Sequence, residues 1–186
     1  MRGMRVAAVF SLLLRGLGLY KIPLPFRLAL IILPLLAALF FAEFVVLKGG
    51  IVISVTDGDS LVFLSRSGQT LKVRLYGVDA PEYDQPGGAE AKKFVSKLVL
   101  FEHVDLREFD EDRYGRVVAL VSLEDGRTLN EELVRAGHSW VYTAYCRSSF
   151  CPRWRILERE ARQSKIGLWK GQKPVYPEKW RRHDFK

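Results

Sequence analysis

Short segments with the composition of β-strands follow one another from residue 51 onward. Residues 51–55 (IVISV), 61–65 (LVFLS) and 70–76 (TLKVRLY) are rich in β-branched and other apolar residues, interrupted by polar ones. The turn sequences TDGDS at 56–60 and SRSGQ at 65–69 separate them. Short strands joined by tight turns predict a three-stranded meander.

Other segments repeat their apolar residues at helical spacing. Residues 89–100 (AEAKKFVSKLVL) place apolar side chains on one helical face and lysines on the other. Thr128 starts the sequence TLNE, which predicts a capping box and a helix over 129–136 that stops at Gly137. A last helix is predicted over about 153–165.

Two further segments, 103–109 and 117–123, bring the number of predicted strands to five. Five short strands with an inserted helix, followed by a helix packed below, predict an α+β domain: an OB-fold five-stranded β-barrel with about three helices. Gly49 and Gly50 predict a hinge in front of this domain. Residues 171–186 are basic and contain proline, so we expect an irregular tail.

The segment before the barrel is apolar throughout. Residues 28–47 (LALIILPLLAALFFAEFVVL) contain one charged residue, Glu43. At about 1.5 Å per residue, a helix of this length reaches roughly 30 Å, the thickness of the bilayer core. We therefore predict a transmembrane helix over about 28–47. A cleaved signal peptide is the alternative, although Phe40 stands where cleavage after Ala42 would need a small residue.

Basic residues are distributed unevenly around this span. Only Lys48 follows the span closely, whereas five basic residues precede it: Arg2, Arg5, Arg15, Lys21 and Arg27. The positive-inside rule then predicts a cytoplasmic N-terminus and an extracytoplasmic domain, either periplasmic or extracellular. The expected organisation is an N-terminal segment with its membrane anchor (1–49), a barrel domain (50–170) and a basic C-terminal tail (171–186).

The composition is that of a folded protein with an uneven charge. Of the 186 residues, 48% are hydrophobic and 27% are charged, which excludes a disordered chain. The net charge of +8 divides into +5 for residues 1–49, −5 for 50–146 and +8 for 147–186. A basic end beside an acidic body suits a polyanion on one surface and a cation on another, although a solvated basic helix and tail would have the same pattern.

Charged residues gather where the third strand is expected to turn, in RLYGVDAPE at 74–82. Because Pro81 ends the strand, Asp79 and Glu82 can lie on opposite sides of one turn. Asp59 follows a hairpin turn and adds a third acid near a strand start. Carboxylates grouped in this way can hold a hard cation such as Ca²⁺, which takes about 6 to 8 oxygen ligands.

The same residues also have ordinary structural uses. Asp57-Gly58 is a common hairpin turn, and Asp79 and Glu82 both suit turns and caps. Arg74 could simply pair with one of the acids. Gly77, inside the strand, indicates a bulge or a close approach of two backbones.

Four motifs together resemble the staphylococcal nuclease (thermonuclease) family. They are TDGDS (56–60), RLYGVDAPE (74–82), DRYGR (112–116) and LNEELVRAGHSWV (129–141), and they occur in the family's order. The resemblance extends from about Ile51 to Trp169 and implies an OB barrel with helices. It also implies hydrolysis of DNA and RNA phosphodiesters that leaves 3′-phosphate ends.

The resemblance implies a calcium site and assigns its ligands. These would be the carboxylates of Asp59 and Asp79 and the backbone carbonyl of Ala80. The founding enzyme of the family has threonine at the position of Ala80. Because the carbonyl oxygen is the ligand, alanine is expected to preserve the site.

The resemblance likewise assigns catalytic and substrate-binding roles. Arg74 and Arg116 would bind phosphate, and Glu82 would orient or deprotonate the attacking water. Planar guanidinium groups and a cation stabilise the negative charge that builds up on the phosphoryl oxygens, and a carboxylate raises the reactivity of water. Tyr114 and Tyr142 would contact the substrate, although either could be an aromatic residue at the barrel edge.

Cys146 and Cys151 are the only cysteines. Outside the cytoplasm we expect them to close a small disulfide loop at the start of the last helix. Two buried thiols would be expected if the domain faced the cytosol. A zinc site would need two more ligands, and the three histidines, His103, His138 and His183, are scattered.

The preferred function is calcium-dependent hydrolysis of DNA and/or RNA with low sequence specificity by a membrane-anchored extracytoplasmic nuclease, which we expect to be a monomer. The alternative is a non-catalytic OB-fold module that binds nucleic acid or protein at the membrane. Family members that only bind have typically lost the acids and arginines. Their presence here favours catalysis.

Overall fold

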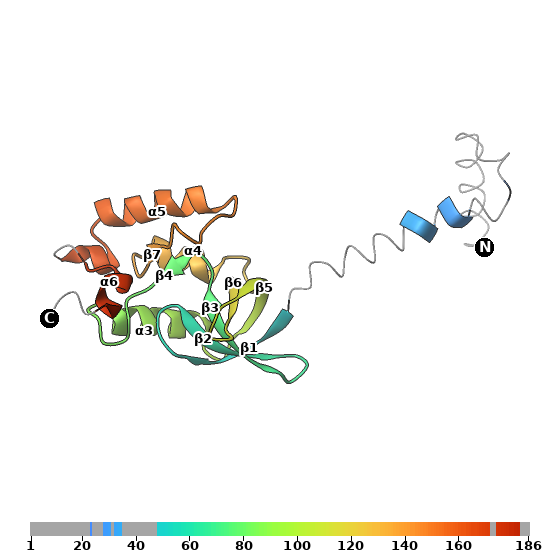
Figure 1. Ribbon diagram of the computed structural model, residues 1–186, viewed down its shortest axis with the longest axis horizontal. Helices are drawn as coiled ribbons and strands as arrows, with labels where there is room; N and C mark the ends of the chain where they lie inside the picture. Colours follow the sequence, from blue (N-terminus) through green and yellow to red (C-terminus); the bar gives the residue numbers. More distant parts are fainter. Residues whose placement is uncertain (1–22, 24–27, 31, 35–47, 172–173, 183–186) are drawn as a thin grey trace, which may run out of the picture. The chain divides into compact units, whose positions relative to one another are not determined.

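The computed structural model describes residues 23, 28–30, 32–34, 48–171 and 174–182. The chain divides into two units, Met1–Val46 and Leu47–Lys186, and the description below concerns the second (Figure 1). In the first unit, residues 28–30 and 32–34 are helical. Most of the predicted span 28–47 lies outside the described residues. Within the residues that are described, no helix has the length and apolar character needed to cross a bilayer.

Five strands form a closed barrel in the order β1-β2-β3-β6-β5. The strands are β1 (Lys48–Val55), β2 (Ser60–Ser65), β3 (Thr70–Leu75), β5 (His103–Glu111) and β6 (Val117–Leu123). The first three are antiparallel neighbours, as the meander prediction requires. Parallel pairing of β3 with β6 and antiparallel pairing of β1 with β5 close the barrel. The predicted five-stranded barrel of an α+β domain is confirmed, and its form is consistent with an OB fold.

The predicted hinge at Gly49 and Gly50 is wrong, because both residues belong to β1. Gly50 pairs with both neighbouring strands, β2 and β5. A Cβ atom on Gly50 would lie 2.2 Å from the carbonyl oxygen of Leu64 and 2.5 Å from Cζ of Phe63. The glycine is therefore needed for close packing inside the barrel.

Alternate residues of the strands fill the barrel. The largest fully buried strand side chains are Val52, Leu61, Phe63, Val73, Leu75 and Leu106. Burial of each such side chain contributes about 1.5–3 kcal/mol to the free energy of unfolding. In β3 the buried Val73 and Leu75 flank Arg74, whose side chain therefore points to the other face of the strand.

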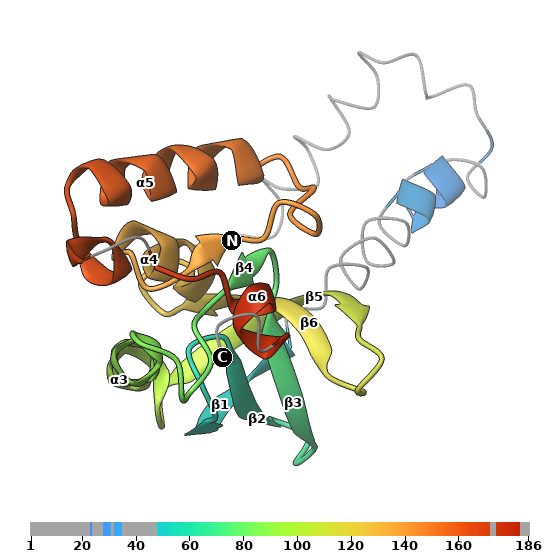
Figure 2. The same cartoon turned by 60° about the vertical axis from the view of Figure 1, so that its left-hand side comes forward.

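The helices of this unit are α3 (Gly88–Val99), α4 (Leu129–Arg135), α5 (Cys151–Gln163), the 3₁₀ helix η2 (Gly167–Lys170) and α6 (Pro177–Arg181). Two helices pack against the barrel, α3 against β1 and α4 against β6, and α5 packs on α4 (Figure 2). Helix α5 lies on one side of the domain and α3 on the other, with α6 between their levels in both views. The three predicted helices are present within about two residues of their predicted bounds. The tail, which was expected to be irregular, contains helix α6.

The capping box predicted at Thr128 is also wrong, since its side chain makes no capping hydrogen bond. Glu131, the residue that would complete the box, instead accepts a hydrogen bond from Nε1 of Trp154 in α5 at 3.2 Å. Its other oxygen pairs with Arg135 and with Arg153. A tertiary contact has replaced the local one.

Buried Asn130 joins helix α4 to the barrel. Its Oδ1 accepts a hydrogen bond from the backbone N–H of Val121 at 3.0 Å. Its Nδ2 donates to the carbonyl oxygens of Tyr76 at 3.0 Å and Ala119 at 3.2 Å. These bonds hold the end of β3 at the point where the chain enters RLYGVDAPE.

A second, two-stranded sheet was not predicted. It pairs β4 (Val78–Asp79) with β7 (Trp140–Val141), so that Asp79 lies opposite Trp140. Each strand is two residues long, too short to produce an alternating pattern in the sequence.

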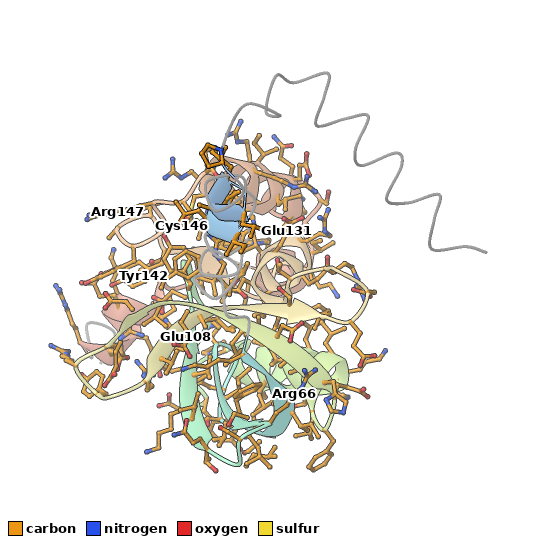
Figure 3. The ribbon with its side chains drawn as sticks, turned by 90° about the vertical axis from the view of Figure 1, so that its right-hand side faces the viewer. Arg66, Glu108, Glu131, Tyr142, Cys146 and Arg147 are labelled. Carbon is orange, nitrogen blue, oxygen red and sulfur yellow. A yellow bond between two sulfur atoms is a disulfide. The ribbon has the colours of Figure 1, made fainter. Side chains whose placement is uncertain are left out.

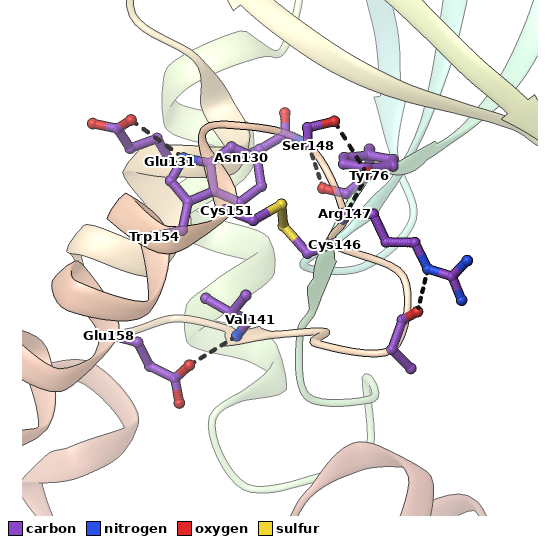
Figure 4. The surroundings of a disulfide bond; sticks show 11 residues. Tyr76, Asn130, Glu131, Val141, Cys146, Arg147, Ser148, Cys151, Trp154 and Glu158 are labelled. Carbon is purple, nitrogen blue, oxygen red and sulfur yellow. Dashed lines mark hydrogen bonds between the residues drawn. A yellow bond between two sulfur atoms is a disulfide. The ribbon is translucent and has the colours of Figure 1, made fainter.

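Cys146 and Cys151 form a disulfide, the pairing considered from the sequence (Figure 4). The loop that it closes packs beside Tyr76, whose hydroxyl accepts a hydrogen bond from the backbone N–H of Arg147 at 3.0 Å. Gly77 has a φ of +70°, and a Cβ atom there would lie 2.8 Å from Sγ of Cys146. The close backbone approach expected at Gly77 is thus present, and the disulfide loop supports the chain two residues before Asp79.

Candidate active site

The hairpin between β1 and β2 is tied directly to the turn that follows β4. Asp59 lies at the end of this hairpin, and its Oδ2 accepts a hydrogen bond from the backbone N–H of Ala80 at 2.7 Å. The carbonyl oxygen of Asp59 accepts another from the N–H of Leu75 at 2.8 Å. Asp57 holds the hairpin itself, because its Oδ1 accepts from the N–H of Asp59 at 2.9 Å.

Arg74 bridges the two aspartates that were predicted to bind metal. Its Nη2 donates to Oδ1 of Asp79 at 2.9 Å, and its Nη1 forms an ion pair with Oδ2 of Asp59. Asp79 is fully buried and the side chain of Arg74 is 14% exposed. Burial opposes the charged guanidinium, but the charges of Asp59 and Asp79 outweigh it and raise the pKa of Arg74.

Arg116 reaches the same place from the turn between β5 and β6. Its Nε pairs with Oδ2 of Asp112 at 2.7 Å, and its Nη1 donates to Oγ of Ser60 at 3.3 Å. Ser60 in turn donates to Oδ1 of Asp59 at 3.2 Å. Through Ser60, the second predicted phosphate-binding arginine lies next to the first aspartate.

Glu82 lies beyond Pro81, and its carboxylate is held by the C-terminal helix. Oε1 of Glu82 lies 2.5 Å from Nη1 of Arg181 in α6. Nη2 of the same arginine lies 3.5 Å from Oδ2 of Asp79. The five predicted residues, Asp59, Arg74, Asp79, Glu82 and Arg116, are therefore linked by a continuous set of polar contacts.

Comparison with known proteins identifies the family of this chain. Residues 72–171 match the model of the family described as staphylococcal nuclease homologue. An uncharacterized endonuclease of Escherichia coli is 39% identical over 132 residues, which cover 71% of this chain and 84% of that protein. The chain belongs to the staphylococcal nuclease family.

Two other relatives from bacteria have similar coverage. An uncharacterized endonuclease of Haemophilus influenzae is 36% identical over 133 residues, 72% of each chain. A micrococcal nuclease of Shigella flexneri is 34% identical over 142 residues, which cover 72% of this chain and 80% of that protein. The family match includes Arg74, Asp79, Glu82 and Arg116 and ends before helix α6.

The acidic groups of the candidate site outnumber its guanidinium groups. Burial and the charge of Asp59 raise the pKa of Asp57 from its usual 3.8 to about 6. Burial likewise raises the pKa of Asp79 to about 6, in spite of Arg74 and Arg181. Five carboxyl groups, those of Asp57, Asp59, Asp79, Glu82 and Asp112, share three guanidinium groups, those of Arg74, Arg116 and Arg181. Two negative charges are left over when all five are ionised, the charge of one divalent cation.

The donor atoms fit a hard cation such as Ca²⁺. The carboxylates of Asp59 and Asp79 and the carbonyl of Ala80 are oxygen donors of the kind that calcium takes. The described residues contain no group of three or more His, Cys, Asp or Glu side chains placed to hold a metal. Calcium here would therefore take two side-chain ligands, and the backbone carbonyl and water would complete its coordination.

The two predicted substrate tyrosines differ in exposure. Tyr114 is 66% exposed, and the guanidinium groups of Arg113 and Arg116 lie 4.9 and 5.5 Å from its ring centroid. Tyr142 is half-buried, its N–H donates to the carbonyl of Gly77 at 2.9 Å, and burial together with the charge of Asp79 raises its pKa. It lies on the same side of the domain as Arg147, away from Glu131 (Figure 3).

Several residues of this site were not identified from the sequence. Ser60 and Asp57 belong to the TDGDS motif, but the motif alone does not show that their side chains connect Arg116 and Asp59. Gln85 is buried and accepts a hydrogen bond from the N–H of Glu82 at 3.1 Å. Arg181 lies in the basic tail, where no motif distinguishes it from the neighbouring arginine.

His103 and His138 belong to different parts of the domain and His183 lies outside the described residues. The two cysteines are joined to each other. The zinc alternative therefore has no support from the described residues.

Proposed function

We propose that this nuclease hydrolyses DNA and/or RNA phosphodiesters with calcium and with low sequence specificity, and leaves 3′-phosphate ends. Membership of the family makes the protein a nuclease, which is a hydrolase. The observation that carries the finer proposal is the bridge from Asp59 through Arg74 to Asp79. It gathers two carboxylates from separate turns around one guanidinium, with Arg116 and Glu82 at its two ends.

The arginines would act on the phosphate. A guanidinium can donate two parallel hydrogen bonds to phosphoryl oxygens, and this interaction strengthens as negative charge develops in the transition state. Arg74 is held in place on both sides by aspartates and Arg116 by Asp112, so neither has to be reorganised during the reaction. Calcium, when bound, would supply further positive charge at the phosphoryl oxygens.

Glu82 would act on water. A carboxylate within hydrogen-bond reach of the attacking water orients it and accepts its proton, which typically accelerates a reaction by about 10²–10⁴-fold. Glu82 suits this role because its side chain is partly exposed, at 34%, whereas Asp79 is fully buried. The backbone of Glu82 is fixed by the buried amide of Gln85.

Low sequence specificity fits the aromatic residue at the edge of the site. A largely exposed ring, such as that of Tyr114, can stack on any base and adds little sequence preference. Arg113 and Arg116, which lie beside this ring, would attract the backbone phosphates. Single-stranded or frayed nucleic acid would offer its bases most readily.

An extracytoplasmic location with an N-terminal membrane anchor is part of the proposal. Its support is the apolar segment 28–47 with basic residues before it, and the disulfide, which is typical of oxidising compartments. We further propose that the nuclease acts as a monomer.

The products test the proposed chemistry. Full-length protein in detergent would be incubated with single-stranded and duplex DNA and with RNA, all of mixed sequence. We expect cleavage at many positions, and DNA fragments that a polymerase extends only after phosphatase treatment. Fragments extended without that treatment would carry 3′-hydroxyl ends and would contradict the proposed bond cleavage.

A further inference from the structure

The C-terminal segment 174–182 is attached to the loop that begins with Glu82. The carbonyl oxygen of Val175 accepts a hydrogen bond from Nε2 of Gln85 at 2.7 Å. Nε1 of Trp180 donates to Oδ1 of Asp84 at 3.1 Å. These two bonds join the C-terminal segment to a loop about 90 residues earlier in the sequence. The loop lies next to Glu82, whose carboxylate is predicted to activate water.

A second set of contacts attaches the same segment to the small sheet that carries Asp79. The ring of Tyr176 packs edge-on against Trp140 at a centroid distance of 5.5 Å and against Tyr142 at 6.4 Å. Trp140 is the β7 residue that pairs with Asp79. Pro177, which opens α6, is buried. The segment is thus fixed on both sides of the site, and its helix projects Arg181 between them.

Arg181 is the most accessible of the three arginines at the site. Its side chain is 44% exposed, compared with 30% for Arg116 and 14% for Arg74. Arg74 takes one oxygen of Asp79, and Arg181 approaches the other. The guanidinium of Arg181 contacts both Asp79 and Glu82. Because it is accessible, a substrate phosphate can reach it without any rearrangement of the buried residues.

We propose that Arg181 is a third substrate-binding arginine, which exchanges Glu82 for a backbone phosphate of the nucleic acid when substrate binds. This inference rests on the proposed function. A phosphate offers a guanidinium two acceptor oxygens at full negative charge and competes well with a single carboxylate oxygen. The exchange both positions the strand and releases the carboxylate of Glu82 toward water. Arg181 lies outside residues 72–171, the part of the chain that matches the family model.

The neighbouring arginine provides an internal comparison. Arg182, which directly follows α6, pairs with Glu178 one turn earlier at 2.5 Å, and its side chain is 68% exposed. Exposed pairs of this kind contribute little to stability. Arg181 instead makes its contacts with residues 99 and 102 positions away in the sequence. The two adjacent residues have the same charge, and only one of them reaches the site.

The test compares full-length Arg181→Ala, Arg181→Lys and Arg182→Ala with the unmodified protein. Thermal unfolding of each variant establishes that it is folded. On a single-stranded DNA oligonucleotide we expect Arg181→Ala to raise KM by about 10- to 100-fold, the range for loss of a hydrogen bond to a charged group. Arg181→Lys keeps the charge but cannot form a bidentate hydrogen bond, so its KM should lie between those of Arg181→Ala and the unmodified protein. Arg182→Ala should stay within about twofold of the unmodified protein.

Substrates with one neutral linkage identify the phosphate involved. In a set of oligonucleotides, each carries a methylphosphonate at a different position around one preferred cleavage site. At one position the neutral linkage should slow the unmodified protein and Arg182→Ala, yet leave Arg181→Ala unaffected. A merely structural role for Arg181 would produce no such position, since its loss would then affect all substrates equally.

Two outcomes would overturn the inference. Equal KM values for the two alanine variants would mean that Arg181 contacts no substrate. A higher kcat in Arg181→Ala would mean that the arginine restrains Glu82 and inhibits the enzyme. Binding of a labelled oligonucleotide, measured by fluorescence anisotropy in chelator, separates this inference from the proposed function. If the unmodified protein binds in chelator but does not cleave when calcium is added, the proposed function fails. Weaker binding by Arg181→Ala than by Arg182→Ala still decides the role of the arginine.

Discussion

Oδ2 of Asp59 accepts a hydrogen bond from the backbone N–H of Ala80 at 2.7 Å, although 21 residues separate them. This bond ties the hairpin between β1 and β2 to the turn after β4. The carboxylate of Asp59 and the carbonyl of Ala80, two of the expected calcium ligands, are thereby placed by one backbone contact. A metal site that used these two groups would depend on the geometry of the barrel.

The Asp59→Asn replacement should weaken metal binding and leave the fold intact. The asparagine side chain keeps an oxygen that can accept from the N–H of Ala80, but it lacks the negative charge that attracts the cation. We expect activity to require at least about tenfold more calcium, a typical loss for a weakened metal site. A calcium titration of the cleavage rate measures this, and an unchanged midpoint would remove Asp59 from the metal site.

Conservative replacement of Arg74 or Glu82, the proposed catalytic groups, should reduce turnover strongly. Arg74→Lys keeps a charge but cannot bridge Asp59 and Asp79 with two nitrogen atoms, and Glu82→Gln removes the acceptor for the proton of water. We expect kcat to fall by about 10²–10⁴-fold in each variant. The matched control is Arg127→Ala. It removes a surface ion pair with Asp125 in which both side chains are about half exposed. Turnover similar to that of the control would refute the assigned roles.

Asp57 and Asp79 should each contribute less to the stability of the metal-free protein as the pH rises from about 4 to about 7. Asp57 and Asp79 have pKa values near 6 in the folded protein and 3.8 as ordinary carboxyl groups. The folded state therefore binds their protons more tightly than the unfolded state does. Their contribution to the free energy of unfolding is complete below about pH 4 and is lost as the pH rises through 6.

Thermal unfolding in chelator across this pH range measures the effect. Asp57→Asn should flatten the dependence, because the asparagine oxygen still accepts from the N–H of Asp59 but does not titrate. Added calcium should raise the unfolding temperature more at pH 8 than at pH 5, where protons compete for the carboxylates. The same pH dependence in Asp57→Asn and in the unmodified protein would contradict the raised pKa of Asp57.

Reduction of the disulfide should destabilise the domain. Closing the short loop between Cys146 and Cys151 restricts the unfolded chain by about 2 kcal/mol in the loop-entropy model. Both cysteines are buried and Cys146 lies beside Gly77, so a change there also affects the chain close to Asp79. Unfolding by denaturant, with and without reductant, should show a lower midpoint for the reduced protein. A Cys146→Ser/Cys151→Ser variant that is insensitive to reductant serves as the control, and an unshifted midpoint in the native sequence would refute the contribution.

Local patterns predicted most of the barrel because each strand and helix is specified by its own residues. The bounds predicted for β6, 117–123, are those observed, and α4 differs by a single residue. The predictions failed where distant residues decide the outcome. Gly50 was predicted to be part of a hinge. The structure instead requires glycine there because Phe63 and Leu64 approach closely across the β1–β2 pair.

In the site, too, local motifs were predictive and contacts between distant residues were not. The four linked motifs identified all five residues that the structure brings together, since motif order in a known family carries spatial information that residue types alone lack. Neither the charge nor the composition of the tail identified Arg181, whose contacts with Glu82 and Asp79 depend on how α6 packs. A tertiary contact across about 100 residues leaves no periodic signal in a single sequence.

The central claim is that Asp59 and Asp79 hold one calcium ion beside Arg74, Arg116 and Glu82. Its most direct test is the cleavage rate of full-length protein on single-stranded DNA, measured in calcium and in excess chelator. The account predicts rapid cleavage with calcium, loss of cleavage with chelator and full recovery when calcium is restored. Equal rates with calcium and with chelator would contradict it.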